Sequence, residues 1–458
     1  MRWSGLLACT HAAAGCIAVL AGCASSAAPD ALVAPPAPCE PALGQQLQAL
    51  VDDPALPLAS LSVLALRDGE VVYRAAFGRR FIHPADPSLD RPATPDTLYR
   101  IASVSKTITA LGALRLVEQG RLSLDGDIGD VLGYPVRNPR HPQHAITLRM
   151  LLSHTSTLGD EAGYFFEADV GLRDVLVPSG AQWQQGAAWQ KQGEPGHWFQ
   201  YANLNYNLLG ALMERASGER FDHLMHRLVL RPLGLAGGYD PSSLSKVDWG
   251  RTATLYRKRD ASERWQPQGP WQPQRDDAQA GQPTAAQSLL RYLPGHNPSP
   301  FSPTGGLRIS ADGLGTVVRM LLNQGRHGGE VFLQPATLEL RHQVHWRWNP
   351  GQPNGDTLDG LFRAWGLGVQ VFTDHAGPPG ADRLVDGGGL AGFGHFGNAY
   401  GAYTGLIYDP ARRMGLVYLV GGVGSDPQTQ PGQWSAQHRF EERIVNALYR
   451  CALLSAAP

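Results

Sequence analysis

Apolar residues recur with helical spacing at several places along the chain. Leu43, Leu47, Leu50 and Val51 lie three or four positions apart, which predicts an amphipathic helix over residues 40–52. The same spacing predicts longer helices elsewhere, over residues 103–118, 203–216, 221–229 and 434–454.

Strand patterns lie near both ends of the chain. Residues 61–66 and 71–77 are rich in β-forming residues and flank an Asp-Gly turn at 68–69, which predicts a hairpin. Residues 402–408 and 414–421 predict a second hairpin. Between the two hairpins, residues 255–303 are polar and rich in Gln and Pro, which predicts a long irregular excursion.

This order of elements predicts an α/β protein of the α+β type. Hairpins from both ends can join one antiparallel sheet, with the terminal helices packed on it. The helical middle, roughly residues 130–300, would be inserted as a second lobe. A cleft between two lobes is a usual place for a binding site, so we expect the site there.

Composition narrows the class of protein. The 458 residues are 43% hydrophobic and 17% charged, with a formal net charge of −1. A chain without a basic surplus lacks the electrostatic footprint of a nucleic-acid binder, so we expect no nucleic-acid partner. We expect a monomer.

The N-terminus has the pattern of an export signal. Arg2 precedes an uncharged apolar stretch over 5–22 that ends in Leu-Ala-Gly before Cys23. This ending resembles a bacterial lipoprotein box, which implies a signal peptide at 1–22, cleavage before Cys23 and lipidation of its thiol. The alternative is an ordinary signal peptide cut near Ala28.

Residues 23–39, rich in Ala and Pro, predict a tether to a folded domain at 40–455. The protein is therefore expected to be exported and held by lipid on a bacterial membrane, facing the periplasm or the exterior. Cys39 and Cys451 remain after processing, and an exported protein keeps its disulfides, so we hypothesise a Cys39–Cys451 bridge. The alternative is two unrelated buried thiols.

Ser103 and Lys106 form a Ser-x-x-Lys pattern at the start of a predicted helix. Residues three apart share a helix face, so the amine can approach the hydroxyl and serve as its base. The pattern is common by chance, and Ser243 with Lys246 repeats it beside Pro241, where we expect a surface turn without a following helix. A capping serine with a solvated lysine is the alternative for the first copy.

Two other segments carry candidate chemistry. Tyr201 and Asn203 place a phenol and an amide on one short segment, although Asn203 can also serve as an N-cap. The glycine-rich run around His395, Gly397 and Asn398 precedes a predicted strand, and an edge strand there could offer an N–H to an oxyanion. By itself this run is more typical of a glycine-rich loop with a structural histidine.

Taken in order, the three segments resemble the serine β-lactamase and penicillin-recognising family. Within it they are most similar to the class C β-lactamases and their relatives among D-Ala-D-Ala peptidases, D-amino-acid amidases and esterases. Further segments share the resemblance, namely residues 146–156, 205–210, 305–307 and 365–368. The resemblance covers roughly residues 45–450 and implies a β-lactamase/transpeptidase-like fold.

The resemblance also implies roles. Ser103 would form an acyl-enzyme, with Lys106 and Tyr201 together moving the proton. Asn203 would orient the acyl chain. The N–H groups of Ser103 and Asn398 would form the oxyanion hole, and His395 and Gly397 would line the third wall. No metal or cofactor is implied, and the His-Pro-Gln-His stretch at 141–144 is expected to be a Pro-rich loop.

This chain departs from the family at two places. The usual Lys-Thr-Gly is replaced by His395-Phe396-Gly397, which removes a fixed positive charge and a hydroxyl that would bind an antibiotic's carboxylate. Thr157 stands where glycine is frequent.

The sequence therefore predicts a serine hydrolase acting on small-molecule or peptide esters or amides, with D-Ala-D-Ala peptides second and β-lactams third. The alternative of another class is a non-catalytic, penicillin-binding-like lipoprotein that binds cell-wall material.

Overall fold

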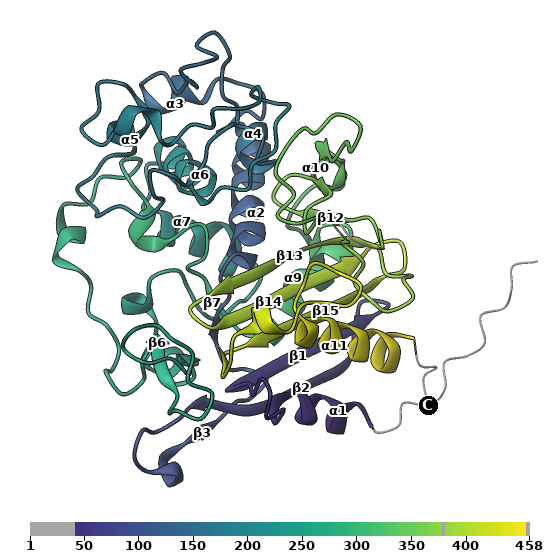
Figure 1. Ribbon diagram of the computed structural model, residues 1–458. Helices are drawn as coiled ribbons and strands as arrows, with labels where there is room; N and C mark the ends of the chain where they lie inside the picture. The colour runs from purple at the N-terminus through teal and green to yellow at the C-terminus, as the bar shows by residue number, and fades with distance from the viewer. Residues whose placement is uncertain (1–41, 377–380, 455–458) are drawn as a thin grey trace, which may run out of the picture. The chain divides into compact units, whose positions relative to one another are not determined.

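The computed structural model describes residues 42–376 and 381–454, drawn as coloured ribbon in Figure 1. All of them belong to one compact unit, Ala37–Pro458. The predicted signal peptide, the tether and both Cys23 and Cys39 lie outside the described residues. Cys451 is disulfide-bonded, and its pairing with Cys39 stays a prediction.

A nine-stranded sheet forms the base of the fold, with the strand order β10-β11-β12-β13-β14-β15-β1-β2-β3. Its strands are β1 (Ser60–Arg67), β2 (Glu70–Phe81), β3 (Arg91–Pro92), β10 (Trp346–Arg347), β11 (Ala364–Trp365), β12 (Gln370–Phe372), β13 (Gly392–Ala399), β14 (Ala402–Asp409) and β15 (Met414–Val420). Strand β15 pairs antiparallel with both β14 and β1. The two predicted hairpins therefore join in one sheet, which confirms the predicted fold class.

Helices cover both faces of this sheet. Val63 and Ala65 of β1 pack in a cluster with α1 (Leu43–Val51) and α11 (Arg439–Leu448). Their neighbours Leu64 and Leu66 point the other way, into the cluster that contains α9 (Ala311–Leu322). Because alternate residues of a strand point to opposite faces, a strand covered on both sides is apolar over successive residues, as β1 is from Val63 to Leu66.

The helical part is arranged around α2 (Val104–Glu118) and α6 (Asn203–Ser217), and in Figure 1 it lies above the sheet. The remaining α-helices are α3 (Ile128–Leu132), α4 (Leu148–Leu152), α5 (Leu172–Leu176), α7 (Phe221–Met225), α8 (Lys246–Gly250) and α10 (Pro335–His342). Every residue of α2 from Val104 to Leu114 is buried. The expectation of an amphipathic helix was wrong here, because α2 is surrounded by protein and keeps no solvent face until its last turns.

Two other predictions need correction. The last helix begins at Arg439 rather than 434, because backbone N–H groups of residues 433–435 donate to the buried Glu442 carboxylate instead of continuing a helix. The excursion at 255–303 is not wholly irregular, since β5 (Leu255–Arg257) and β6 (Gln272–Arg275) form a small sheet with β16 (Gly422–Val423).

The remaining strands form two short pairs, β4 (Tyr99–Arg100) with β7 (Arg308–Ile309) and β8 (Arg326–His327) with β9 (Glu330–Val331). Within the described ranges, no helix combines the length and hydropathy needed to cross a bilayer.

Candidate active site

Ser103 occupies the N-cap position of α2 and leaves its hydroxyl free for chemistry. The side chain makes no capping hydrogen bond, and Ala102 before it has a left-handed backbone with φ of 47°. Such a conformation is costly for alanine and is found where the surrounding structure imposes it. The alternative of a serine that merely caps its helix does not fit this geometry.

Lys106 lies one turn further along α2 and is completely buried. Its Nζ donates to Ser103 Oγ at 3.1 Å, to Asn203 Oδ1 at 2.8 Å and to the Thr304 carbonyl at 3.1 Å. Burial lowers the pKa of Lys106 to about 7, although the Asp160 carboxylate opposes the shift. A large fraction of this amine is therefore neutral near pH 7 and can accept a proton, which a solvated lysine cannot do.

Tyr201 places its phenol beside the same serine and hydrogen-bonds to it. Its ring stacks on His154 with centroids 4.5 Å apart and on Phe362 at 5.0 Å. Burial raises the pKa of Tyr201 above its usual value, and the hydrogen bond with Ser103 only partly offsets this. The phenol is thus protonated at neutral pH and suited to relay a proton, whereas Lys106 is the better base.

The loop that contains His154, the residue stacked on Tyr201, has unusual backbone conformations. His154 has φ of 57° and Thr157 has φ of 64°. A positive φ explains why glycine suits the position of Thr157. Thr157 is held there by buried hydrogen bonds, donating to the Ser156 carbonyl and accepting from the Asn138 amide. The substitution that departs from the family pattern therefore keeps the turn and adds side-chain contacts to it.

Asn203 is the first residue of α6, and Ala202 is the N-cap. The capping group comes instead from Asp160, whose carboxylate accepts from the backbone N–H groups of Asn203 and Leu204 and from the Asn203 side-chain amide. This fixes the amide so that its oxygen faces Lys106. The expected N-cap role of Asn203 was wrong, and sequence reasoning missed Asp160 because 43 residues separate it from its partner.

Strand β13 carries the third predicted segment, and its side chains alternate between the two faces of the sheet. His395 faces the site, 6.0 Å from Tyr201 and 5.4 Å from Trp365 between ring centroids. Phe396 points to the opposite face and packs on Phe372 and Tyr418. The loss of a hydroxyl at this position thus affects core packing, which corrects the expectation that Phe396 would alter the substrate side.

His395 supplies no fixed positive charge to the site. Burial lowers its pKa to about 3, and the nearby Lys106 contributes to the shift. Its Nδ1 lies 2.6 Å from the Phe396 carbonyl, and its buried Nε2 has no hydrogen-bond partner among the described residues. A neutral imidazole at this place cannot replace the lysine that holds an antibiotic's carboxylate.

Gly397 lets β13 approach the nucleophile closely. A Cβ there would lie 2.9 Å from the Ser103 nitrogen, 2.6 Å from the Ile101 carbonyl and 2.5 Å from Thr404 Oγ1. Strand β12 pairs with β13 only at residues 392–394, so β12 leaves the edge of β13 uncovered from residue 395 onward. Segment 394–401 is therefore mainly a strand instead of a loop, and this edge of the strand lies beside the site.

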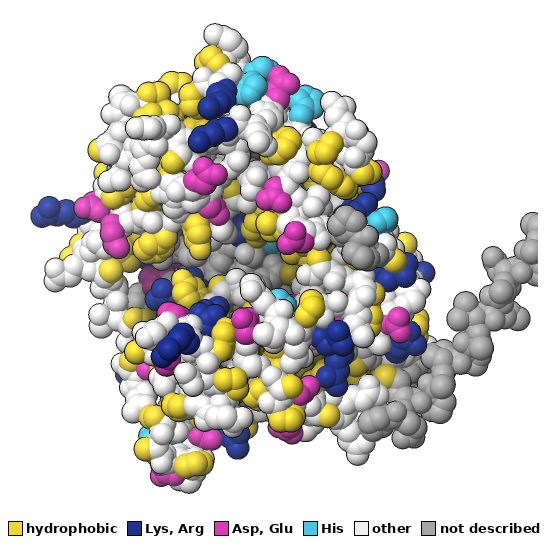
Figure 2. Space-filling model, in the orientation of Figure 1, with side chains coloured by type: hydrophobic (Ala, Val, Ile, Leu, Met, Phe, Trp, Pro, Cys, Tyr) yellow, Lys and Arg dark blue, Asp and Glu magenta, His cyan; other side chains and the backbone are white. Residues whose placement is uncertain are grey.

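A cavity of about 880 Å³ opens beside the nucleophile. Ser103, Asn203 and Asn398 line it together with Tyr164 and Tyr400. Figure 2 shows the surface hollowed between the helical part and the sheet. Of the predicted site residues, the structure brings Ser103, Lys106, Tyr201, Asn203, His395 and Gly397 together, and Asn398 lines the same cavity as Ser103.

The second Ser-x-x-Lys copy lies at the surface. Ser243 and Lys246 are both exposed, and the Ser243 hydroxyl donates to the Asp240 carbonyl. A short helix, α8, does begin at Lys246 and is capped by Ser245, which corrects the expectation of no helical continuation. Lys246 is the first residue of α8, whereas Ser243 lies before the helix in a separate turn, Pro241–Ser243. The two side chains therefore do not share one face of a helix.

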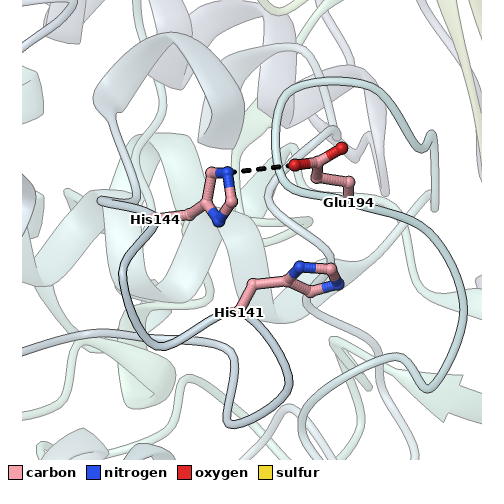
Figure 3. A group of neighbouring side chains, drawn as sticks. All are labelled: His141, His144 and Glu194. Atoms are coloured by element: carbon pink, nitrogen blue, oxygen red, sulfur yellow. Dashed lines mark ion pairs between the residues drawn. The ribbon is translucent and has the colours of Figure 1, made fainter.

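His141, His144 and Glu194 form a cluster outside this pocket (Figure 3). Their ligand atoms lie within 4.8 Å of one another, and His144 Nε2 pairs with the Glu194 carboxylate at 3.0 Å. Two imidazoles and a carboxylate are a donor set that zinc accepts. The exposed His–Glu ion pair already accounts for the arrangement, so the cluster enters no step of the chemistry below.

An antiparallel sheet joined to a helical lobe, with a serine and a buried lysine on the first turn of the helix between them, defines a class of proteins built around a nucleophilic serine. The family model described as Beta-lactamase matches residues 47–437. The chain belongs to the beta-lactamase family.

Curated relatives agree with this assignment. Over 190 residues the chain is 35% identical to Esterase EstB of Burkholderia gladioli, covering 39% of this chain and 46% of the esterase. It is 30% identical over 182 residues to Penicillin-binding protein 4* of Bacillus subtilis, covering 38% and 36%. These matches thus span less than half the length of either relative.

Solved structures share the fold. D-amino acid amidase from Ochrobactrum anthropi SV3 superposes with a TM-score of 0.57 at 20% identity, covering 89% of this chain and 98% of the amidase. EstCE1, a hydrolase with promiscuous acyltransferase activity, gives 0.56 at 23%, with 89% and 98% covered.

Proposed function

We propose that this protein is a serine hydrolase that cleaves esters or amides through an acyl-enzyme at Ser103. One observation carries the proposal: a completely buried amine with a pKa of about 7 donates to the hydroxyl of a serine that opens a helix beside a cavity. A non-catalytic module has no need for a desolvated base at that place, since burying an amine costs stability.

In the acylation step, the Ser103 oxygen attacks the substrate carbonyl carbon while Lys106 Nζ accepts the hydroxyl proton. The negative charge moves to the carbonyl oxygen, which the N–H groups of Ser103 and Asn398 stabilise. The Ser103 N–H makes no hydrogen bond within residues 42–376 and 381–454, so it is available for this role.

Collapse of the tetrahedral intermediate breaks the bond to the leaving group. Tyr201 passes a proton to the departing oxygen or nitrogen and is reprotonated by Lys106. In deacylation a water molecule gives its proton to the same pair and attacks the ester carbon. The products are the leaving group, a carboxylic acid and the regenerated Ser103.

Among substrates, esters and small amides stand first. The neutral His395 supports this order, because a β-lactam needs a cation for its carboxylate where this chain has an uncharged imidazole. Peptides ending in D-Ala-D-Ala also carry a carboxylate that the neutral imidazole does not pair, and we place them second and β-lactams third. The esterase among the relatives points in the same direction.

We also propose that the protein is exported, lipidated at Cys23 and monomeric. Replacing Cys23 by serine should move the protein from the membrane fraction to the soluble fraction and abolish incorporation of labelled palmitate. Recovery of an unlabelled wild-type protein that begins near residue 29 would instead support an ordinary signal peptide.

Activity is tested with a chromogenic ester, a chromogenic cephalosporin and a D-Ala-D-Ala peptide. We expect the ester to be cleaved fastest and Ser103→Ala to lower kcat/KM by about 10³-fold or more, since nucleophile loss removes the covalent route. Ser243→Ala is the matched control and should leave the rate unchanged. Undiminished activity in Ser103→Ala, or failure of every acylating probe to label Ser103, would favour the non-catalytic alternative.

A further inference from the structure

The cavity beside Ser103 contains a guanidinium group without a carboxylate partner. Arg100 Nε donates to the Gly305 carbonyl at 3.0 Å, and the two terminal nitrogens have no hydrogen-bond or ion-pair partner among the described residues. Burial and repulsion from Arg308 lower the pKa of Arg100 to about 10, so it is still a cation at neutral pH. The Asp276 carboxylate, which holds Arg308, offsets this shift only in part, so an anionic ligand in the cavity would supply the additional negative charge.

Tyr400 connects Arg100 to a second arginine of the cavity wall. The Arg100 guanidinium lies 5.0 Å from the Tyr400 ring centroid and the Arg275 guanidinium 4.5 Å from it. Arg275 also reaches the Tyr400 hydroxyl at 3.4 Å and has no acidic partner among the residues described. The tyrosine therefore places two cations around one side of the cavity.

The acidic groups of the cavity are mostly engaged elsewhere. Asp276 holds Arg308 with two hydrogen bonds of 2.7 and 3.1 Å. Asp160 accepts from the N-terminus of α6. Asp277 accepts from the Gln279 backbone N–H and is the remaining carboxylate of the wall. The two arginines at Tyr400 thus exceed the carboxylates left to balance them.

The position of this wall indicates which part of a substrate it meets. The cavity is lined by Asn203 and Asn398, whereas neither Tyr201 nor His395 belongs to its lining in the part of the chain that the structure describes. The leaving group must lie near Tyr201 to receive its proton, so the cavity takes the acyl portion.

We infer that the acyl group of the substrate carries a carboxylate, which Arg100 and Arg275 bind on the two sides of Tyr400. The inference rests on the proposed acyl-enzyme function. A planar carboxylate matches the fork of a guanidinium, and such charge-assisted hydrogen bonds are stronger than neutral ones. Tyr164, Phe165 and Trp249, which also line the cavity, can pack on the apolar stem that joins the carboxylate to the reacting carbonyl.

The test compares two esters of 4-nitrophenol with the same shape. One is the monoester of adipic acid, and the other is 6-methylheptanoate, in which an isopropyl group replaces the carboxylate. For the wild type we expect kcat/KM to be about ten- to hundredfold higher for the adipate ester, the range expected for a charge-assisted pair. High salt should reduce this ratio because it screens the arginines.

Arg100→Gln and Arg275→Gln should each lower the adipate-to-isostere ratio about tenfold, while Arg100→Lys should retain part of it. Arg326→Gln, a change at an exposed arginine of the β8–β9 hairpin, is the control and should leave the ratio unchanged. A wild-type ratio of one or below, or a ratio that neither variant lowers, would overturn the inference.

The outcomes separate this inference from the function on which it rests. Ser103-dependent hydrolysis of 6-methylheptanoate without preference for adipate refutes the anionic acyl group alone. If neither ester is hydrolysed, binding of both to Ser103→Ala by calorimetry still checks the preference without turnover, and tighter binding of the adipate ester supports it. Equal binding refutes it.

Discussion

The chain contains two copies of Ser-x-x-Lys that differ in almost every physical property. At Ser103 the lysine is completely buried, touches the serine hydroxyl and has a pKa lowered to about 7. At Ser243 both residues are exposed, and the hydroxyl is used by a backbone carbonyl. The spacing is the same, so the chemistry comes from the surroundings: a desolvated amine, a phenol and a backbone that approaches closely.

The largest expected contrast comes from replacing each lysine by methionine, which keeps an unbranched side chain of nearly the same length but removes the amine. Lys106→Met removes the general base and should lower kcat/KM by about 10²- to 10⁴-fold. Lys246→Met should change neither the rate nor the unfolding temperature. Ester hydrolysis by the two purified variants, with circular dichroism to confirm that each is folded, provides the measurement. Equal activity of the two would remove the base from the proposal.

Adding a methyl group to a glycine in each region should give the next largest contrast. Gly397→Ala pushes a Cβ against the Ser103 nitrogen and the Ile101 carbonyl, so we expect kcat to fall by about 10²-fold. The free energy of unfolding should fall by about 1–3 kcal/mol through overpacking.

Gly250, at the end of α8 near the second copy, provides the control. Nothing lies within 4 Å of its added Cβ, so Gly250→Ala should leave activity intact and stability unchanged or slightly higher. Ester kinetics and urea unfolding test both variants. A fully active Gly397→Ala would mean that the close approach of β13 is not needed.

The pH dependence of ester hydrolysis should come from Lys106 of the first Ser-x-x-Lys copy. The neutral form of Lys106 accepts the proton, so kcat/KM should rise with pH below about 7 and level off above it. His395, with a pKa near 3, does not titrate in this range.

Stability should follow the same group. The pKa of Lys106 is lower in the folded state than in the unfolded chain, so the unfolded chain binds more protons between pH 7 and about 10, where a free lysine titrates. The free energy of unfolding therefore gains a contribution that increases with pH over that window. Urea unfolding at pH 7 and 9 should show a smaller increase for Lys106→Met than for the wild type. An identical increase in both would assign it to other groups.

The smallest contrast concerns the helix caps. Asp160→Asn removes a carboxylate that raises the pKa of Lys106, so the acid limb of the rate profile should move to lower pH. It should also cost about 0.5–1.5 kcal/mol of stability, because the amide NH₂ replaces one of the two oxygens that accept hydrogen bonds at the start of α6. Ser245→Ala, which uncaps α8, should leave the limb in place. If the acid limb of the pH–rate profile is the same for Asp160→Asn and the wild type, then Asp160 stabilises α6 without affecting the pKa of Lys106.

Local patterns predicted the elements that depend on neighbouring residues. The helix at 43–51, the hairpin around Asp68 and Gly69, and the strands β14 and β15 all appear close to the expected positions. Strand β13 was harder to recognise, because three glycines interrupt its alternation and only pairing with β12 and β14 makes it a strand. The start of α11 was misplaced because Glu442 binds backbone groups that a periodic pattern assigns to the helix.

By itself the sequence determined which residue types are present, which segments form the two hairpins and the main helices, and which short motifs resemble the family. Only the tertiary structure showed that Lys106 is buried against Ser103 while Lys246 is exposed, which face Phe396 occupies, and that Asp160 and Arg100 line the cavity beside Ser103. The physical reason is that burial and charge arise from contacts between segments far apart in the chain. A lysine becomes a base only when other segments remove its water.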